Sequence, residues 1–178
     1  MEKIIIAISG HAQNGKDTAA DQMTQLLGPE RCGRASLARV VKEQAKMLGW
    51  DGKKDEKGRT LLQNISELVK NYHSKDYYVQ RCYEDCLDEF EKGKEIIFIT
   101  DIRYLIETNF FKDRGAFLLR IERPESDSWK SPLTPEQQAH ASEAELNNYP
   151  FENVIINDGT IDDLKNKLAR LLKEKGIE

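Results

Sequence analysis

The sequence predicts an α/β fold in which helices cover both faces of a parallel sheet. Two observations carry this prediction. Short apolar runs rich in β-branched residues alternate along the chain with longer segments whose apolar residues recur at helical spacing. The main strand-like runs are almost continuously apolar, as expected for strands that are buried on both faces. Regular alternation of strand and helix over 178 residues is typical of one domain built around a parallel sheet.

The expected elements follow one another in a regular order. Strands are expected at residues 3–9, 31–36, 95–100, 116–121 and 154–156. Helices are expected from residue 16, over 37–48, over 61–72, over 79–90, after 103 and from 161. Residues 51–58 are expected to form a charged loop. Thr160 and Asp163 have the spacing of a capping box, which places the start of the last helix.

The composition excludes several classes of protein. Apolar residues make up 39% and charged residues 33% of the chain, which is typical of a folded globule. No apolar run approaches the roughly 20 residues that cross a bilayer, so no membrane partner is expected. The net charge of −4 argues against a nucleic-acid polymer as partner, because such binding usually needs a basic face. Three cysteines without a leader pattern predict free thiols and a cytoplasmic location.

The segment from Gly10 to Thr18, Gly-His-Ala-Gln-Asn-Gly-Lys-Asp-Thr, carries the strongest chemical signal. It matches G-x-x-x-x-G-K between an expected strand and an expected helix, which is the context of a phosphate-binding loop. Glycines let successive backbone N–H groups point at phosphate oxygens, and the helix N-terminus adds partial positive charge. Lys16 is therefore expected to reach the β- and γ-phosphates of a nucleoside triphosphate. An ordinary glycine-rich turn is the alternative.

The position after this lysine departs from the usual motif. Asp17 stands where serine or threonine is usual, and Thr18 follows one place later. Each side chain offers the hard oxygen that Mg²⁺ prefers, so both are candidate metal ligands. A favourable acid in the first turn of a helix is the alternative for Asp17.

Asp101 and Arg103 follow the strand expected at 95–100. Ligands in open α/β sheets bind beyond the carboxyl ends of the strands, so both side chains are expected to face the phosphate loop. An acid there can organise metal-bound water or an acceptor, and an arginine can neutralise charge on a transferring phosphoryl group. A capping aspartate and a solvated arginine are the alternatives.

Arg120 and Arg123 flank the end of the strand expected at 116–121. The polar, proline-containing segment that follows, over 122–140, has no clean periodicity. We interpret it as a lid, because mobile segments that carry arginines often close phosphoryl-transfer sites against water. A solvated loop between elements is the alternative.

Together these segments resemble the bacteriophage-type deoxynucleoside monophosphate kinases and, more remotely, dephosphocoenzyme A kinase and other P-loop monophosphate kinases. Beyond the phosphate loop, the resemblance rests on short blocks that fall in the family order and span nearly the whole chain. These blocks are Ser36-Leu37-Ala38 with Lys42, Gly58-Arg59-Thr60-Leu61-Leu62-Gln63, Asp101-Ile102-Arg103-Tyr104, Arg120-Ile121-Glu122-Arg123-Pro124, His140-Ala141-Ser142-Glu143 and Asn157-Asp158-Gly159-Thr160.

The resemblance implies one three-layer α/β/α P-loop kinase domain over residues 1–178, with a helical acceptor-binding region at 37–92 and a lid at 122–140. It implies transfer of the γ-phosphoryl group of ATP, with Mg²⁺, to a (deoxy)nucleoside monophosphate. The catalytic residues that it implies are Lys16, Asp101, Arg103 and Arg123. The ATP-binding residues that it implies are Gly10, Asn14, Gly15, Lys16, Asp17, Thr18, Arg120, Asn157 and Gly159. The acceptor contacts that it implies are Lys42, Arg59, Gln63, His140 and Glu143. For Lys42, Arg59 and Gln63 the alternative is an exposed polar position on an amphipathic helix, and for the block that holds His140 and Glu143 it is a helix cap at Ser142.

Two other functions stay open at this point. One is a P-loop kinase for a phosphate-bearing acceptor that is not a nucleotide, and the other is a nucleotide-binding module without transfer activity. Release of ADP that depends on an added monophosphate separates a kinase from such a module. The expected partners are small-molecule nucleotides, and a homodimer is one of the assembly states that the sequence leaves open.

Overall fold

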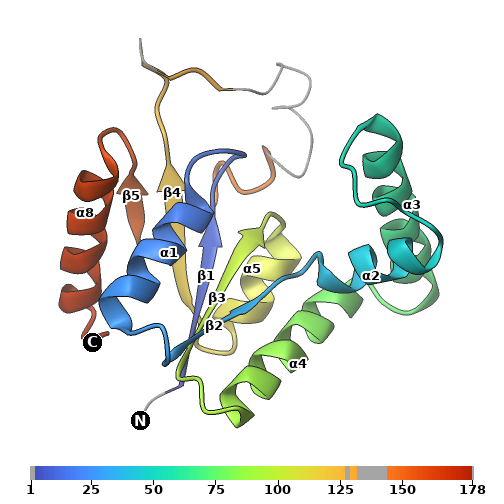
Figure 1. Ribbon diagram of the computed structural model, residues 1–178, viewed down its shortest axis with the longest axis horizontal. Coiled ribbons are helices and arrows are strands. Elements are labelled where there is room, and N and C mark those ends of the chain that lie inside the picture. Colours follow the sequence, from blue (N-terminus) through green and yellow to red (C-terminus); the bar gives the residue numbers. More distant parts are fainter. Residues whose placement is uncertain (1–2, 127–128, 132–143, 178) are drawn as a thin grey trace.

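The computed structural model describes residues 3–126, 129–131 and 144–177 (Figure 1). Within these residues the sheet has five strands, all parallel, in the order β2-β3-β1-β4-β5. The strands are β1 (Ile4–Ser9), β2 (Cys32–Ala35), β3 (Ile96–Ile102), β4 (Phe117–Glu122) and β5 (Val154–Ile156). Because the strands are parallel, their carboxyl ends meet at one edge of the sheet, and this edge is where ligands bind in open α/β folds. The predicted parallel sheet is confirmed.

The central strand β1 shows why the apolar runs form strands here. Ile6 lies opposite Phe98 of β3 on one side and Phe117 of β4 on the other. Since successive side chains point to opposite faces, Ile6 and Ile8 join the core on one face, and Ile5 and Ala7 join the core on the other. A strand with helices over both faces must be apolar at consecutive positions, which explains the unbroken run.

Among the described residues, α1, α4, α5 and α8 form the outer layers (Figure 1). The helices α1 (Lys16–Leu27) and α8 (Ile161–Glu174) pack on one face of the sheet. The helices α4 (Tyr77–Glu91) and α5 (Leu105–Lys112) pack on the other face. This arrangement is the predicted three-layer α/β/α architecture. None of the described helices combines the length and the apolar character that crossing a bilayer requires.

The helices α2 (Arg39–Met47) and α3 (Glu56–Tyr72) lie beside the sheet layers and form a small core of their own (Figure 1). Val41, Ala45 and Ile65 meet Tyr78 of α4 in this core. The helical region expected over 37–92 therefore divides, because α4 packs on the sheet while α2 and α3 do not. Leu68 and Tyr72 complete the apolar stripe expected over 61–72, yet they are 71% and 82% exposed.

Several element boundaries differ from those that the sequence suggests. The helix α3 begins at Glu56, within the expected loop, because the Asp55 carboxylate caps it by accepting from the Gly58 N–H at 2.8 Å. The strand β3 continues two residues past Thr100 and ends at Ile102. The capping box of Thr160 and Asp163 is confirmed. The segment expected as a lid starts on the last residue of β4, and residues 127–128 and 132–143 lie outside the described part of the chain.

Candidate active site

The loop between β1 and α1 has a shape that requires glycine at two positions. Gly10 and Gly15 have φ angles of 149° and 96°, in the region that favours glycine. A Cβ on Gly10 would collide with the carbonyl oxygen of Ile121 in β4, and a Cβ on Gly15 would lie 2.6 Å from the Asn157 Nδ2. The loop is therefore packed tightly between β4 and the segment that follows β5.

Two asparagines hold the loop in this place. The Asn14 side chain is buried, and its Nδ2 donates to the Ile121 carbonyl at 3.2 Å. The Asn157 Nδ2 donates to the Asn14 carbonyl at 2.9 Å. The structure thus brings both asparagines to the phosphate loop. Gly159, expected to bind ATP, lies against the α8 capping box, where an added Cβ would come within 2.6 Å of the Asp163 Oδ2.

The Lys16 ammonium lies over the loop and is only 8% exposed. Its Nζ donates to the carbonyl oxygens of Gly10 at 2.7 Å and His11 at 2.8 Å. A charged phosphate oxygen is a stronger acceptor than a neutral carbonyl. A phosphate oxygen in the loop would therefore compete with these two carbonyls for the lysine.

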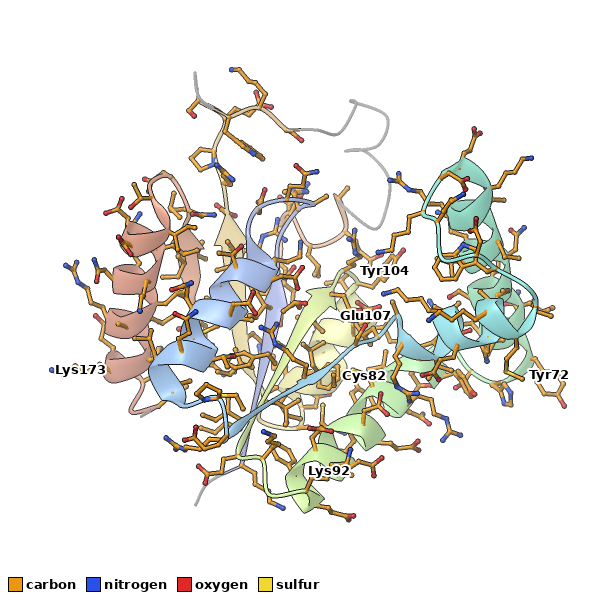
Figure 2. The ribbon with its side chains drawn as sticks, viewed as in Figure 1. Tyr72, Cys82, Lys92, Tyr104, Glu107 and Lys173 are labelled. Atoms are coloured by element: carbon orange, nitrogen blue, oxygen red, sulfur yellow. The ribbon has the colours of Figure 1, made fainter. Side chains whose placement is uncertain are left out.

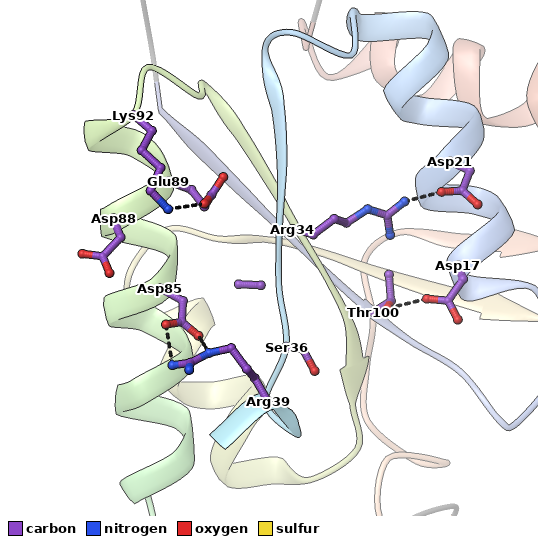
Figure 3. A pocket seen from close by; sticks show the side chains of 11 residues that line it. Asp17, Asp21, Arg34, Ser36, Arg39, Asp85, Asp88, Glu89, Lys92 and Thr100 are labelled. Atoms are coloured by element: carbon purple, nitrogen blue, oxygen red, sulfur yellow. Dashed lines mark hydrogen bonds and ion pairs between the residues drawn. The ribbon is translucent and has the colours of Figure 1, made fainter. Parts of the chain in front are cut away.

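Asp17 joins the start of α1 to the end of β3 (Figure 3). Its Oδ1 accepts a hydrogen bond from the Thr100 Oγ1 at 2.6 Å. Both residues line a cavity of about 620 Å³, which Ser36 also lines and which Arg39 and Asp85 border from α2 and α4. The sequence analysis missed Thr100, although its place directly before Asp101 at a strand end was a usable signal.

The residues of this corner fit a magnesium ion that arrives with a nucleotide. Among the described residues, no three acidic, histidine or cysteine side chains gather into a cluster that would hold a metal ion alone. Mg²⁺ in kinase sites takes one or two carboxylates and completes its shell with phosphate oxygens and water. Asp17 is exposed with one oxygen held by Thr100, and Thr18 is half-buried beside it. Both residues therefore remain candidate ligands.

The Asp101 carboxylate is bound by the segment that leads into α2. Its Oδ2 accepts from the Ser36 Oγ at 2.7 Å and from the Ala38 N–H at 3.0 Å, and its Oδ1 accepts from the Leu37 N–H at 3.1 Å. Asp101 therefore caps a segment 63 to 65 residues earlier in the chain. This contact connects the end of β3 to the segment that leads into α2, a link that local sequence does not reveal.

Four basic side chains form a cationic cluster near Asp101: Lys42, Lys54, Arg59 and Arg103. The charge of Lys42 lowers the pKa of Lys54 most, and partial burial and the charges of Arg103 and Arg59 lower it further. The Asp101 carboxylate opposes this effect. The Arg59 Nε also donates to the Lys54 carbonyl at 3.0 Å. Because like charges in close range repel, such a cluster is suited to an anion.

The cluster brings together Lys42, Arg59 and Arg103, three residues that sequence reasoning had selected. Lys54 was missed, because it lies in the stretch expected as a plain charged loop. Gly58 allows this loop to approach α3, since a Cβ there would collide with the Lys53 carbonyl oxygen. Gln63 is exposed on α3, one helical turn after Arg59.

A second cavity, of about 360 Å³, lies on the other side of the phosphate loop and is lined by His11, Asn14, Arg120, Arg123 and Ile156, among others. Arg120 is 5% exposed, and its guanidinium donates to the Ser9 Oγ at 3.1 Å and the Asn147 Oδ1 at 3.3 Å. The Arg123 guanidinium lies 4.8 Å from the centre of the Trp129 ring. His140 and Glu143 lie outside the described residues.

Comparison with solved structures supports the fold. The dephospho-CoA kinase from Campylobacter jejuni superposes with a TM-score of 0.58 at 14% identity, and the match covers all of both chains. At this identity the likeness concerns the fold alone. It confirms the predicted P-loop kinase architecture.

Sequence relatives are viral. The chain is 28% identical over 116 residues to the deoxynucleotide monophosphate kinase of Enterobacteria phage T4. This match covers 65% of the chain but only 45% of the phage protein. A relative from Acanthamoeba polyphaga mimivirus is 23% identical over 191 residues, covering 93% of this chain and 94% of its own length.

The family model for deoxynucleotide monophosphate kinase matches residues 54–168. The matched part starts after the phosphate loop and begins at Lys54, the residue that sequence reasoning missed. It also takes in Asp101, Arg103 and Asn157. The match extends over more than half of the chain, and the resemblance stated from the sequence is confirmed: the chain belongs to the deoxynucleotide monophosphate kinase family.

Proposed function

We propose that this protein transfers the γ-phosphoryl group of ATP to a (deoxy)nucleoside monophosphate and releases ADP and a diphosphate. One observation carries the proposal: two separate anion-binding features lie at one strand end. The phosphate loop contacts Thr100 through Asp17, and the cationic cluster includes Arg103, three residues later. A kinase whose acceptor also bears a phosphate needs two such places, one for each anionic substrate.

The donor half holds ATP. The loop N–H groups and Lys16 bind the β- and γ-phosphates, and Asp17 or Thr18 holds Mg²⁺, which neutralises charge on the phosphates. The cavity lined by His11, Arg120 and Arg123 takes the nucleoside part of ATP, next to Asn157. Arg123 contributes its charge to the transferring group when the segment after β4 covers the site.

The acceptor half holds the monophosphate. Lys42, Lys54 and Arg59 bind its phosphate group, and Gln63 lies one turn away for a contact to the nucleoside. Arg103, at the edge nearest β3, spreads the charge that develops during transfer. An acceptor phosphate oxygen attacks the γ-phosphorus, and the bond from phosphorus to the β–γ bridging oxygen breaks as ADP leaves. Little covalent help is needed, so placement and charge carry the catalysis.

The test is a coupled assay of ADP release with ATP and Mg²⁺ across a panel of acceptors. The panel holds the deoxynucleoside and ribonucleoside monophosphates and, as controls, phosphate-bearing compounds without a base. We expect ADP release only with nucleoside monophosphates. ADP release without an acceptor, or binding of ATP without any turnover, would contradict the proposal. Preference for a phosphate-bearing compound without a base would support kinase activity but contradict a nucleoside monophosphate as the acceptor.

A further inference from the structure

Glu107 is a buried carboxylate at the corner between β3 and α5 (Figure 2). Its side chain is on the third residue of α5, and the residue is 7% exposed. One oxygen, Oε2, accepts two hydrogen bonds, from the Arg103 N–H at 2.7 Å and from the Tyr104 N–H at 3.0 Å. Glutamate is rarely buried in this way, because desolvation of its charge is costly.

The bond to Arg103 goes beyond what the start of a helix requires. Tyr104 is the N-cap residue of α5, so the bond to its N–H satisfies a helix end. Arg103 precedes the N-cap, and an exposed Ser, Thr, Asp or Asn at the cap would start the helix without burying a charge. The buried glutamate therefore fixes the strand end from which the Arg103 side chain departs.

Two charged side chains, one on β3 and one on α3, act on this carboxylate. Burial raises the pKa of Glu107 to about 7, against the two backbone N–H groups, which lower it. Asp101 on β3 raises this pKa, and Lys70 on α3 lowers it. Lys70 also lies over the Tyr104 ring, with its Nζ 5.5 Å from the ring centre. On α5 itself the Thr108 Oγ1 donates to the Tyr104 carbonyl at 3.0 Å.

We propose that Glu107 is a positioning residue: it holds the backbone of Arg103 and Tyr104 and thereby directs the Arg103 guanidinium toward the transferring phosphoryl group. This inference rests on the proposed function, since it assigns Arg103 a task in phosphoryl transfer. Burial outweighs the two hydrogen bonds and raises the pKa of Glu107 from 4.5 to about 7, so the folded state holds the carboxyl best in its protonated form. The hold on Arg103 is therefore complete in acid and loosens as the pH rises through about 7.

Because one oxygen of Glu107 accepts both hydrogen bonds, substitution by glutamine can separate the effect of geometry from the effect of charge. Glutamine has one amide oxygen and can accept both bonds, so Glu107→Gln keeps the geometry but does not titrate. Glu107→Ala removes both bonds. Glu145→Ala is the matched control, because the Glu145 carboxylate accepts from the N–H of Leu105 at 2.7 Å in the same corner but is exposed and does not contact Arg103.

The first measurement is amide hydrogen exchange at Arg103 and Tyr104 in the protein without ligand, from pH 5.5 to 8.5, corrected for intrinsic exchange. In the unaltered protein we expect protection to fall roughly tenfold from pH 5.5 to 8.5, because the folded state holds the Glu107 proton more tightly than an opened state does. Glu107→Gln should be flat, Glu107→Ala should lose the protection, and Glu145→Ala should keep it. Equal protection in all four proteins would overturn the inference.

The second measurement separates kcat from KM. At pH 8, Glu107→Ala should lower kcat roughly 10- to 100-fold, as a misplaced catalytic group does, with little change in KM for ATP. Glu107→Gln should stay within about threefold of the unaltered kcat and lack the pH dependence that Glu107 causes across pH 7, so it still tests the inference if the alanine variant fails to fold. No ADP release from the unaltered protein would contradict the proposed function. Normal release that Glu107→Ala and Glu107→Gln leave unchanged would contradict this inference alone.

Discussion

The two halves of the candidate site are built in different ways. The phosphate-binding part of the donor half is one continuous loop, Gly10 to Thr18, between a central strand and the helix that follows it. The acceptor half collects Lys42, Lys54, Arg59 and Arg103 from four places on α2, α3, the loop between them and the end of β3. A site made of consecutive residues is readable in the sequence, whereas a site made of distant residues depends on the whole fold.

The halves also differ in burial. Lys16 is 8% exposed and is held by two carbonyl oxygens. Lys54 is exposed, and it stands on the small α2–α3 core rather than on the sheet. We therefore expect changes in the donor half to act on the reaction rate and changes in the acceptor half to act on the affinity for the acceptor.

The largest effect is expected from Lys16→Ala. Loss of one fixed charge that stabilises the transferring group typically lowers kcat by about 10²- to 10³-fold. Steady-state kinetics measures this, and the thermal unfolding midpoint checks that the domain stays folded. Lys173→Ala, an exposed lysine on α8, is the control and should leave kcat unchanged. A folded Lys16→Ala protein with normal turnover would contradict the proposal that the phosphate loop binds the donor.

The second prediction concerns stability and pH at the acceptor half. The pKa of Glu107 is raised by burial, from 4.5 to about 7, so the folded state holds its proton more tightly than the unfolded state. Its contribution to stability is complete below about pH 4.5 and is lost as the pH rises through about 7. The loss is on the order of 3 kcal/mol. Urea unfolding of the unaltered protein and of Glu107→Gln should show this difference, and parallel pH curves would contradict it.

The third prediction uses two neighbouring lysines. Lys54→Met should raise KM for the monophosphate about tenfold with a smaller effect on kcat, because a charged hydrogen bond to the acceptor is lost. Lys53→Met is the control, since Lys53 pairs with Asp51 at 3.4 Å and is exposed. Equal effects of the two substitutions would mean that the cationic cluster acts only through its overall charge.

The smallest effect is expected for magnesium. If Asp17 binds the metal, Asp17→Ala should raise the Mg²⁺ concentration for half-maximal rate roughly fivefold, about 1 kcal/mol. Thr100→Val removes only the hydrogen bond to Asp17 and should do less. Thr18→Val should also do less. If Thr18→Val has the larger effect, the metal belongs to Thr18.

The sequence was sufficient for features that depend on neighbours along the chain. The strands were predicted because burial on both faces requires unbroken apolar runs, and the phosphate loop because its glycines, lysine and acid are consecutive. The helical spacing over 61–72 predicted an apolar stripe, but it did not show which residues would cover that stripe. In the structure Leu68 and Tyr72 of this stripe are exposed. The structure shows where the described site residues lie, but the roles assigned to all of them, Lys16, Asp101 and Arg103 as much as Gln63, Gly159, His140 and Glu143, stay predictions.

Contacts between residues far apart in the chain could not be predicted from the sequence. Thr100 meets Asp17 across 83 positions, and Asp101 caps the segment before α2 only because β3 lies beside β2 in the sheet. In the sequence, Glu107 indicates at most the start of a helix and gives no sign of its contact with Arg103. Such residues become visible only when strand order and register are known.

The hydrogen bond between Asn157 and the Asn14 carbonyl spans 143 positions. It has a consequence for synthesis of the chain. The phosphate loop leaves the ribosome early, but its brace follows only after β5, the edge strand, has been made. A nascent chain that stops before β5 carries a loop without this support. If the loop binds ATP as proposed, nucleotide added during translation should therefore protect only chains that have been made past Asn157.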